Sequence, residues 1–400
     1  MGAAETAGIV LRKGRPETPE TMERHRKRSL PCCLPLLALL LSCPLAGVAQ
    51  PWPPDREKHA LIISGIGGEE GYQQQFRDWT ARLHKLLIGR LGFAPERVTV
   101  LTEAPAGDTA AFGGSPQARS TAAEVRRVLN EWQGAVTPRQ QIFLFFIGHG
   151  TFDGQVGKFN LVGPDLTAAE YGELLARVRA ARTTILQLAS ASGEFLKPLA
   201  ASDRIVLTAT RSGMEQNAPK FAEYFLKALE SGDGDLDKNG RVSVYEAFQF
   251  ANQGVADLYR QAGKLATEHA LLDDTGDGVG LSASGEPEQK RKPEGETEVK
   301  AASVAVADGG LARTTYFDSL PQQEAGGDSV LAKWIEERMR LEGAIEQLKS
   351  RRPSLAPAEY ATQIEKMLIE LARLGRAIRQ RRQSPASGAP PSANPGEEDR

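Results

Sequence analysis

The chain contains 400 residues, of which 40% are hydrophobic and 25% are charged. This balance is typical of a soluble globular protein, and the length allows one core of ordinary size with appended segments. The 49 basic and 51 acidic residues give a formal net charge of -2, so the charge excludes a protein built to bind nucleic acid.

Residues 1–49 have the order of an export signal. A basic stretch at 23–29 precedes an apolar run at 30–46, and small residues follow up to Ala49. The apolar run is shorter than the roughly 20 residues that a membrane helix needs. We therefore expect cleavage near Ala49 and a periplasmic or secreted protein. A lipid anchor at Cys43 is a weaker alternative because a proline follows it, and an uncleaved anchor is the remaining one.

All cysteines of the chain lie in this predicted signal, at Cys32, Cys33 and Cys43. A chain cleaved after Ala49 would therefore contain no cysteine, and it could form neither a disulfide nor a thiol nucleophile.

Short apolar runs alternate with amphipathic stretches over residues 50–281. The runs are almost entirely apolar, which is typical of strands buried on both faces of a parallel sheet. Between them, apolar residues recur every three or four positions, which indicates helices. The alternation predicts an α/β sandwich with a mainly parallel central sheet. The predicted strands are Ala60–Ser64, Val98–Leu101, Ile142–Ile147, Thr184–Ala189 and Ile205–Ala209, and the predicted helices lie near 72–87, 121–132, 168–178 and 217–230.

Two of the predicted strands end in residues that can carry catalysis. His149 follows the strand at 142–147, and Ser190 follows the strand at 184–189. Groups at the C-terminal ends of neighbouring parallel strands can meet, because such strands lie about 4.8 Å apart. A base beside a nucleophile indicates acyl transfer, with the backbone N–H groups of Gly150 and Ser190 as oxyanion donors. A buried histidine bonded to the backbone is the alternative for His149.

The order and spacing of these motifs resemble the caspase-like cysteine peptidases, and most of all the bacterial members of the legumain branch (peptidase C13). In that family a strand ends in His-Gly, and a later strand ends in Ala-Cys-x-Ser-Gly. The matching segments here are His149-Gly150 and Ala189-Ser190-Ala191-Ser192-Gly193, within a resemblance that covers residues 57–280. The resemblance implies a caspase-type α/β sandwich. It places His149 at the family's catalytic histidine and Ser190 at its nucleophilic cysteine.

Ser190 departs from the family at the position that matters most. A cysteine thiol has a pKa of about 8.5, so a nearby histidine can form the thiolate, whereas a serine hydroxyl needs a tightly held and oriented base. No acidic motif indicates an orienting group for His149, and no Gly-x-Ser-x-Gly elbow surrounds Ser190 because Leu188 takes the first glycine position. We therefore expect a catalytically impaired peptidase homologue that binds a peptide or protein as a scaffold. The alternatives are a peptidase or other acyl hydrolase with a Ser190–His149 dyad, and an activity at a different site.

Residues 235–246, DLDKNGRVSVYE, match the twelve-residue calcium loop of the EF-hand at each diagnostic position. Gly240 takes the position of the sharp turn. A single loop without a paired partner favours a structural calcium ion, and a solvated polar turn is the alternative. The expected ligands are Asp235, Asp237, Asn239, the carbonyl of Arg241, Ser243 through a water molecule, and Glu246.

The segment 273–278 is a partial copy of this loop. Ser284 stands where the closing glutamate should be. We therefore expect a turn at 273–278, with a weak calcium site as the alternative.

The C-terminal part of the chain divides into three predicted segments. Residues 282–327 are charged and rich in proline at their start, which indicates a linker, and 312–317 could form an extra strand. Heptad spacing in 328–383 predicts a helical hairpin with coiled-coil packing, through which the chain could associate with itself. Residues 384–400 are rich in proline, glycine, serine and glutamate and are expected to be disordered.

Overall fold

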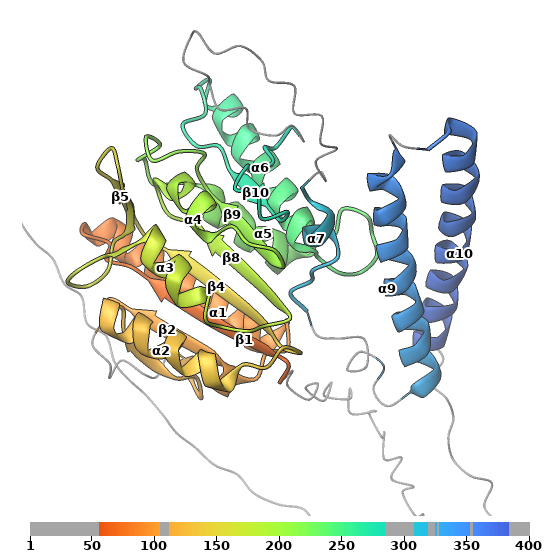
Figure 1. Cartoon of the computed structure of the whole chain (residues 1–400), viewed down its shortest axis with the longest axis horizontal. Coiled ribbons are helices and arrows are strands. Elements are labelled where there is room, and N and C mark those ends of the chain that lie inside the picture. The colour runs from red at the N-terminus through yellow and green to blue at the C-terminus, as the bar shows by residue number, and fades with distance from the viewer. Residues whose placement is uncertain are drawn as a thin grey trace, which may run out of the picture. The chain divides into compact units, whose positions relative to one another are not determined.

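Figure 1 shows the computed structural model of the chain, which describes residues 56–104, 112–284, 308–318, 325, 328–352 and 355–383. The predicted export signal, the predicted C-terminal tail and most of the predicted linker lie outside these residues. None of the helices in the described ranges combines the length and the apolar character required to cross a lipid bilayer.

A central sheet of seven strands forms the core, in the order β10-β9-β8-β4-β1-β2-β3. Every neighbouring pair is parallel except β10 with β9. All five predicted strands are present, and the predicted α/β sandwich with a mainly parallel sheet is confirmed, an arrangement consistent with a caspase-like sandwich. The strands are β1 (Lys58–Ser64), β2 (Val98–Thr102), β3 (Gln117–Arg119), β4 (Gln141–Ile147), β8 (Arg182–Gln187), β9 (Arg204–Thr208) and β10 (Leu271–Asp273).

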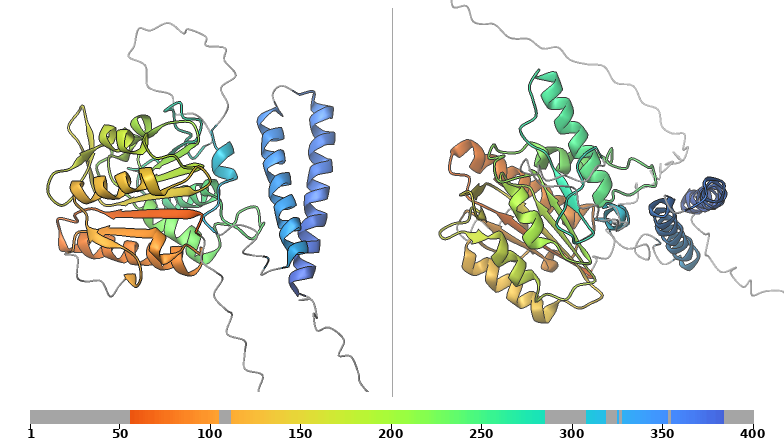
Figure 2. Two further views of the ribbon diagram at one scale, coloured as in Figure 1. Left: turned by 60° about the horizontal axis from the view of Figure 1, so that its bottom comes forward. Right: turned by 45° about the horizontal axis from the view of Figure 1, so that its top comes forward.

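Helices cover both faces of the sheet (Figure 2). Successive side chains of a strand point to opposite faces, so Ile62 packs with the α1, α5 and α6 side while Leu61 packs with the α2, α3 and α4 side. Both faces are apolar, which is why the strand sequences are continuous apolar runs. The helices are α1 (Glu70–Gly89), α2 (Ala122–Ala135), α3 (Ala168–Leu175), α4 (Leu196–Leu199), α5 (Phe221–Ser231) and α6 (Val244–Gln261), with 3-10 turns η1 (Pro95–Arg97) and η3 (Ser192–Phe195).

Helices α3 and α6 begin with the same capping motif. The side chain of Thr167 accepts from the backbone N–H of Glu170 at the start of α3, and the Glu170 carboxylate accepts from the backbone N–H of Thr167. Ser243 and Glu246 form the same reciprocal pair at the start of α6. The Ser/Thr-x-x-Glu spacing produces this capping box because it satisfies two N–H groups that a helix start leaves unpaired.

A second, small sheet follows β4 along the chain. It is antiparallel, with the order β5-β6-β7, and consists of β5 (Gly150–Phe152), β6 (Gly157–Phe159) and β7 (Leu166–Thr167). Because β5 begins directly after His149, this sheet rests against the C-terminal end of β4, where the candidate site lies.

The prediction of an extra strand at 312–317 is wrong. Residues Gly310–Arg313 form a short helix, α7, and Tyr316 makes only an isolated bridge to Ser243. The segment crosses the N-terminal ends of the strands instead of running along an edge. The ammonium of Lys58, at the start of β1, donates to the carbonyls of Phe317 and Asp318. The buried ring of Phe317 packs into the core, so the apolar character that indicated a strand serves packing.

The predicted C-terminal helical hairpin is confirmed. It consists of α9 (Ser329–Ser350) and α10 (Pro357–Gln383). Leu331 and Ile335 of α9 pack with Leu374 and Ile378 of α10, in agreement with the heptad spacing. Near the open end, the guanidinium of Arg381 binds the Asp328 carboxylate that also caps α9.

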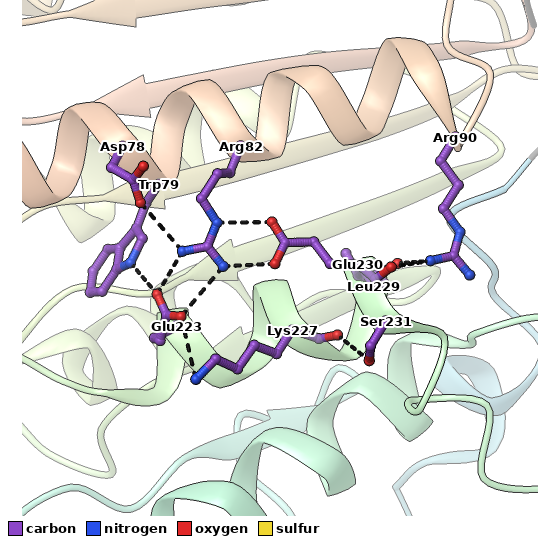
Figure 3. A network of polar contacts seen from close by, with 9 residues as sticks. All are labelled: Asp78, Trp79, Arg82, Arg90, Glu223, Lys227, Leu229, Glu230 and Ser231. Atoms are coloured by element: carbon purple, nitrogen blue, oxygen red, sulfur yellow. Dashed lines mark hydrogen bonds and ion pairs between the residues drawn. The ribbon is translucent and has the colours of Figure 1, made fainter.

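A network of charged side chains joins α1 to α5 (Figure 3). The guanidinium of Arg82 lies between the carboxylates of Glu223 and Glu230, at 2.8 Å and 2.7 Å. Glu223 also accepts from the indole N–H of Trp79 at 2.7 Å. At the other end of α1, Arg90 donates to the carbonyls of the last turn of α5. These contacts fix α5 against α1 on one face of the sheet.

Candidate functional site

The structure places His149 and Ser190 at the same edge of the sheet. β4 and β8 are parallel neighbours, and Phe146 of β4 lies beside Gln187 of β8. The chain leaves both ladders a few residues later, at His149 and Ser190. β4 is central, and the strand order reverses between β1 and β4, which is where open α/β sheets place their ligand crevice. The predicted neighbourhood of the two strand ends is therefore present.

The hydroxyl of Ser190 is bonded to the backbone of Gly150. The Gly150 N–H donates to Ser190 Oγ at 3.2 Å, and Ser190 Oγ donates to the Gly150 carbonyl at 3.2 Å. The residue is only 1% exposed. A Cβ atom at position 150 would lie 2.4 Å from the Ser190 carbonyl oxygen, so this contact requires glycine. The hydroxyl of the expected nucleophile, Ser190, and the N–H of the expected oxyanion donor, Gly150, are thus hydrogen-bonded to each other.

The imidazole of His149 faces α1. Its ring meets Tyr72 and Phe76 edge to face, with ring centroids 4.7 Å and 4.9 Å away. Burial lowers the pKa of His149. The negative charge of Glu69 and a hydrogen bond to the Gly67 backbone raise it, but by less. Within the described residues, no hydrogen bond joins this ring to Ser190. The imidazole is therefore a partly buried group beside two aromatic rings, with a pKa below its usual value.

Sequence analysis missed the two groups that act on the His149 imidazole, a backbone hydrogen-bond partner and a nearby negative charge. Gly67 and Glu69 belong to the loop between β1 and α1, about 80 positions earlier in the chain. The Gly67 N–H also donates to the Glu103 carboxylate at 3.1 Å. No local motif marks such partners, because only the β1–β4 pairing brings the loop to His149.

The turn after Ser190 is tightly fixed. Ala191 has a φ of 52°, in the left-handed region that non-glycine residues rarely adopt, and its N–H donates to the Glu215 carbonyl at 2.9 Å. The Ser192 hydroxyl accepts from the Thr210 N–H at 3.0 Å. Ser192 is therefore a structural residue, and the backbone around Ser190 is held from both sides.

A cavity of about 410 Å³ lies beside this turn. It opens between the β5–β6 turn, the η3–α4 segment and the loop around Gly278, and Leu196 and Val156 give it apolar surface. Lys197, Arg211 and Glu194 supply its charges; the Glu194 carboxylate accepts from the Gly213 N–H at 2.9 Å. Sequence analysis did not find this cavity, because its walls come from segments far apart in the chain.

The loop at 235–246 has the backbone of a calcium loop. The Asp235 carboxylate accepts from the N–H groups of Asn239 and Gly240, and Gly240 has the positive φ, 90°, of the sharp turn. Carboxylate oxygens of Asp235, Asp237 and Glu246 lie within 4.8 Å of one another. Three of the six predicted ligands therefore already converge.

The other three predicted ligands make different contacts. The Asn239 side-chain oxygen accepts from the Arg241 N–H at 2.9 Å, and the Ser243 hydroxyl serves the capping box. The buried Arg241 guanidinium points away from the loop, binds the Asp318 carboxylate and stacks 3.9 Å over the Tyr316 ring. The ligand expected from Arg241 is its backbone carbonyl, which is part of the loop, and these guanidinium contacts do not involve it.

The carboxylates of this loop repel one another. Although Asp237 is an exposed residue, its carboxylate lies beside Glu246 and Asp235. Partial removal from water raises its pKa, and so do the charges of Glu246 and Asp235, against the hydrogen bonds from Asn239. A divalent cation would reverse this repulsion, and oxygen ligands of this kind suit calcium.

The turn expected at 273–278 is present, and a distant residue completes an acidic cluster there. The Asp273 carboxylate accepts from the N–H groups of Gly276 and Gly278 at 2.8 Å each. Asp308, from within the predicted linker, brings a third carboxylate to Asp273 and Asp277. Burial and the charges of the neighbouring aspartates raise the pKa of Asp308 to about 7, against a backbone hydrogen bond. The sequence spacing could not indicate this long-range partner.

Comparisons with known proteins assign no family to this chain. No protein-family model matches the chain, and no curated protein matches it. Among solved structures, the chain is similar to protein GSU0716 from Geobacter sulfurreducens, with 15% sequence identity and a TM-score of 0.34. That match covers 54% of this chain and 92% of the other. The resemblance to caspase-like peptidases therefore rests on the sequence motifs.

Proposed function

We propose that this chain is a peptidase homologue without peptidase activity, which binds an extended peptide or protein segment at the C-terminal edge of its sheet. The observation that carries the proposal is the pairing of Ser190 with the backbone of Gly150. A serine attacks a carbonyl only when a base takes its proton during attack. Here the hydroxyl donates to a carbonyl oxygen, and the imidazole faces two aromatic rings.

The cavity at Gly193 and Glu194, in the turn that follows Ser190, supports binding without cleavage, because neither Ser190 nor His149 lines it. Its walls combine apolar surface with a few fixed polar groups, as ligand sites usually do. Ser190 already occupies the N–H and carbonyl of Gly150 in β5, so an extended segment would bind across the cavity itself and place a side chain between the β5–β6 turn and α4. The Arg211 guanidinium binds the Glu215 carboxylate at 3.2 Å and the Glu194 carboxylate accepts a backbone N–H, so Lys197 supplies the cavity charge that forms no ion pair within the described residues. The favoured partner therefore carries acidic side chains.

The proposal includes a structural calcium ion in the loop at 235–246. The loop is joined to the N-terminal end of the sheet, because Arg241 binds Asp318, and the Asp318 carbonyl accepts from Lys58 at the start of β1. The peptide cavity lies at the C-terminal end of the strands. Calcium at this position would hold α5, α6 and the crossing segment together and would take no part in binding the peptide.

The proposed export rests on residues 1–49 alone, which lie outside the described residues. N-terminal sequencing of protein recovered from the periplasm or the medium is the direct test. A start after Ala49 supports the proposal, and a retained signal in a cytoplasmic protein contradicts it.

A fluorophosphonate probe, which labels activated serines, is expected to leave Ser190 unmodified in the processed protein. Labelling should equal that of Ser190→Ala, measured as the mass shift of the intact protein. In Ser190→Cys, the new thiol should react with iodoacetamide at least tenfold more slowly than the thiol of Ser202→Cys, because Ser190 is buried and Ser202 is exposed. Stoichiometric labelling that disappears in Ser190→Ala would instead establish the hydrolase alternative.

Peptides selected from a random displayed library on the wild-type protein are expected to be acidic and to be recovered uncut. Lys197→Glu should weaken their binding by about tenfold, because reversing one charge at the cavity changes attraction to repulsion. Lys333→Glu, on an exposed lysine of α9, is the matched control and should leave the affinity unchanged. Isothermal titration calorimetry measures both. Equal loss of affinity in the two variants would contradict a site at the cavity.

A further inference from the structure

Helix α10 has a second face beside the one that packs on α9. Five of its residues recur at spacings of three and four, so they share one side of the helix. They are Ala361, Glu365, Leu368, Ala372 and Arg376, and all of them are exposed. We call this set the outer face of α10.

The outer face is apolar at its centre. Leu368 is 48% exposed, and the adjacent Ile369 is 45% exposed. The alanines at 361 and 372 are short, so another helix could approach closely along this stripe. A pair of large apolar residues in the middle of an exposed helix, with small residues on either side, favours contact with a second helix.

The charges of α10 are divided along its length. Up to residue 370 the helix carries three glutamates and one lysine, which gives a net charge of -2. From residue 371 on it carries five arginines and no acidic residue, which gives a net charge of +5. Glu365 and Arg376 of the outer face form no ion pair within the part of the chain that the structure describes. Each half of this helix is thus complementary to the opposite half of an identical helix.

We propose that the protein forms a two-fold symmetric dimer in which the outer faces of two α10 helices pack antiparallel. With the symmetry axis near residues 370 and 371, Glu365 of one copy lies opposite Arg376 of the other, and the symmetry produces this pair twice. Leu368 of each copy then packs on Ala372 of the other. A parallel pair would place arginine against arginine along the whole C-terminal half, which charge repulsion disfavours.

The size of the contact sets the expected strength. α10 has 27 residues and is therefore about 40 Å long, at roughly 1.5 Å per residue. One helix pair of this length lies at the lower end of stable interface sizes, so dissociation constants on the order of micromolar are expected. The dimer does not depend on the peptide-binding proposal, because α10 contributes nothing to the cavity.

Sedimentation velocity of the processed full-length protein, over a range of concentrations around the micromolar, tests the proposal. The wild type should sediment as a dimer at the highest concentration. Glu365→Arg and Arg376→Glu should each weaken dimerisation at least tenfold, since each brings like charges together. The double variant with both substitutions should restore it, because the charges are only exchanged. Arg373→Glu, at an exposed position outside the outer face, is the matched control and should behave like the wild type.

Each outcome decides the proposal. A wild type that stays monomeric at every concentration overturns it. A dimer that survives both single substitutions places the interface elsewhere, and a double variant that stays monomeric contradicts the antiparallel arrangement. Circular dichroism at 222 nm should be the same for all variants, since the substituted side chains are exposed, and a loss of helix in one variant would remove only that variant from the comparison.

Discussion

Calcium is expected to raise the free energy of unfolding of the metal-free protein by about 3 kcal/mol. A ligand that binds only the folded state adds about 2.7 kcal/mol when its free concentration is one hundred times the dissociation constant. The loop at 235–246 should bind in this way, because its three carboxylates converge only in the folded chain. Urea unfolding followed by circular dichroism, with EDTA and then with excess calcium, measures the difference.

Glu246→Gln should abolish most of this calcium-dependent increment. Glutamine can still cap α6 through Ser243, but its amide nitrogen cannot accept from the N–H groups of Leu236 and Asp237 as the second Glu246 oxygen does, so the metal-free stability should fall by about 1–3 kcal/mol. It cannot supply the charged, bidentate ligand that closes such a loop. The variant therefore separates the capping role of the side chain from its proposed metal-binding role.

Glu170→Gln is the matched control for this substitution. Glu170 caps α3 through Thr167 with the same geometry, far from the acidic loop, so this variant should keep the full calcium increment. An increment that persists in Glu246→Gln would contradict calcium binding at 235–246. An increment that disappears in both variants would point to a general effect of the charge change.

The fold could be predicted from the sequence because burial on both faces gives each strand a continuous apolar run. The runs at 142–147 and 184–189 coincide with β4 and β8 for this reason. The edge strands β3 and β10 have three residues each and were not predicted. The segment at 312–317 was wrongly expected to be a strand, because apolar packing by Phe317 looks the same in a sequence as a strand residue.

The candidate sites could be predicted only where their residues are near in sequence. The loop at 235–246 has all its expected ligands within twelve positions, so a local pattern indicates which carboxylates converge there. The neighbourhood of His149 and Ser190 followed from parallel strand order. The backbone partner of Ser190, the Glu69 charge beside His149 and the contribution of Asp308 to its cluster depend on contacts between distant segments, and no local pattern encodes them.

Arg82→Met is expected to lower the free energy of unfolding by about 2–3 kcal/mol. The Arg82 side chain is 26% exposed. It binds Glu230 through two parallel hydrogen bonds, at 2.8 Å and 2.7 Å, and Glu223 through two more, at 2.8 Å and 3.4 Å (Figure 3). Removing the cation leaves two partly buried carboxylates, both on α5, near each other at the contact with α1. Breaking a fully buried pair costs about 3–5 kcal/mol, and the remaining solvent exposure reduces that cost.

Arg127→Met is the matched control for the α1–α5 network. Arg127 also binds two carboxylates, Glu124 and Glu131, but all three groups lie on α2 and the arginine side chain is 46% exposed. Helix-surface pairs of this kind contribute about 0.3–0.5 kcal/mol each, so the loss should stay below about 1 kcal/mol. Equal losses in the two variants, measured by urea unfolding at pH 7, would contradict a special role for the link between the helices.

The contribution of Arg82 should also depend on pH in a defined direction. Burial opposes ionisation of Glu223, but the hydrogen bonds from Arg82 and Trp79 outweigh it and hold the pKa of this carboxyl below its usual value. A carboxyl with a lowered pKa stabilises the fold above its unfolded pKa of about 4.3, and this stabilisation is lost as the pH falls through the folded-state pKa. The difference between the wild type and Arg82→Met should therefore be constant from pH 6 to 8 and shrink below pH 4. A difference that does not shrink in acid would mean that the side chain of Arg82 stabilises the two helices by packing and not by charge.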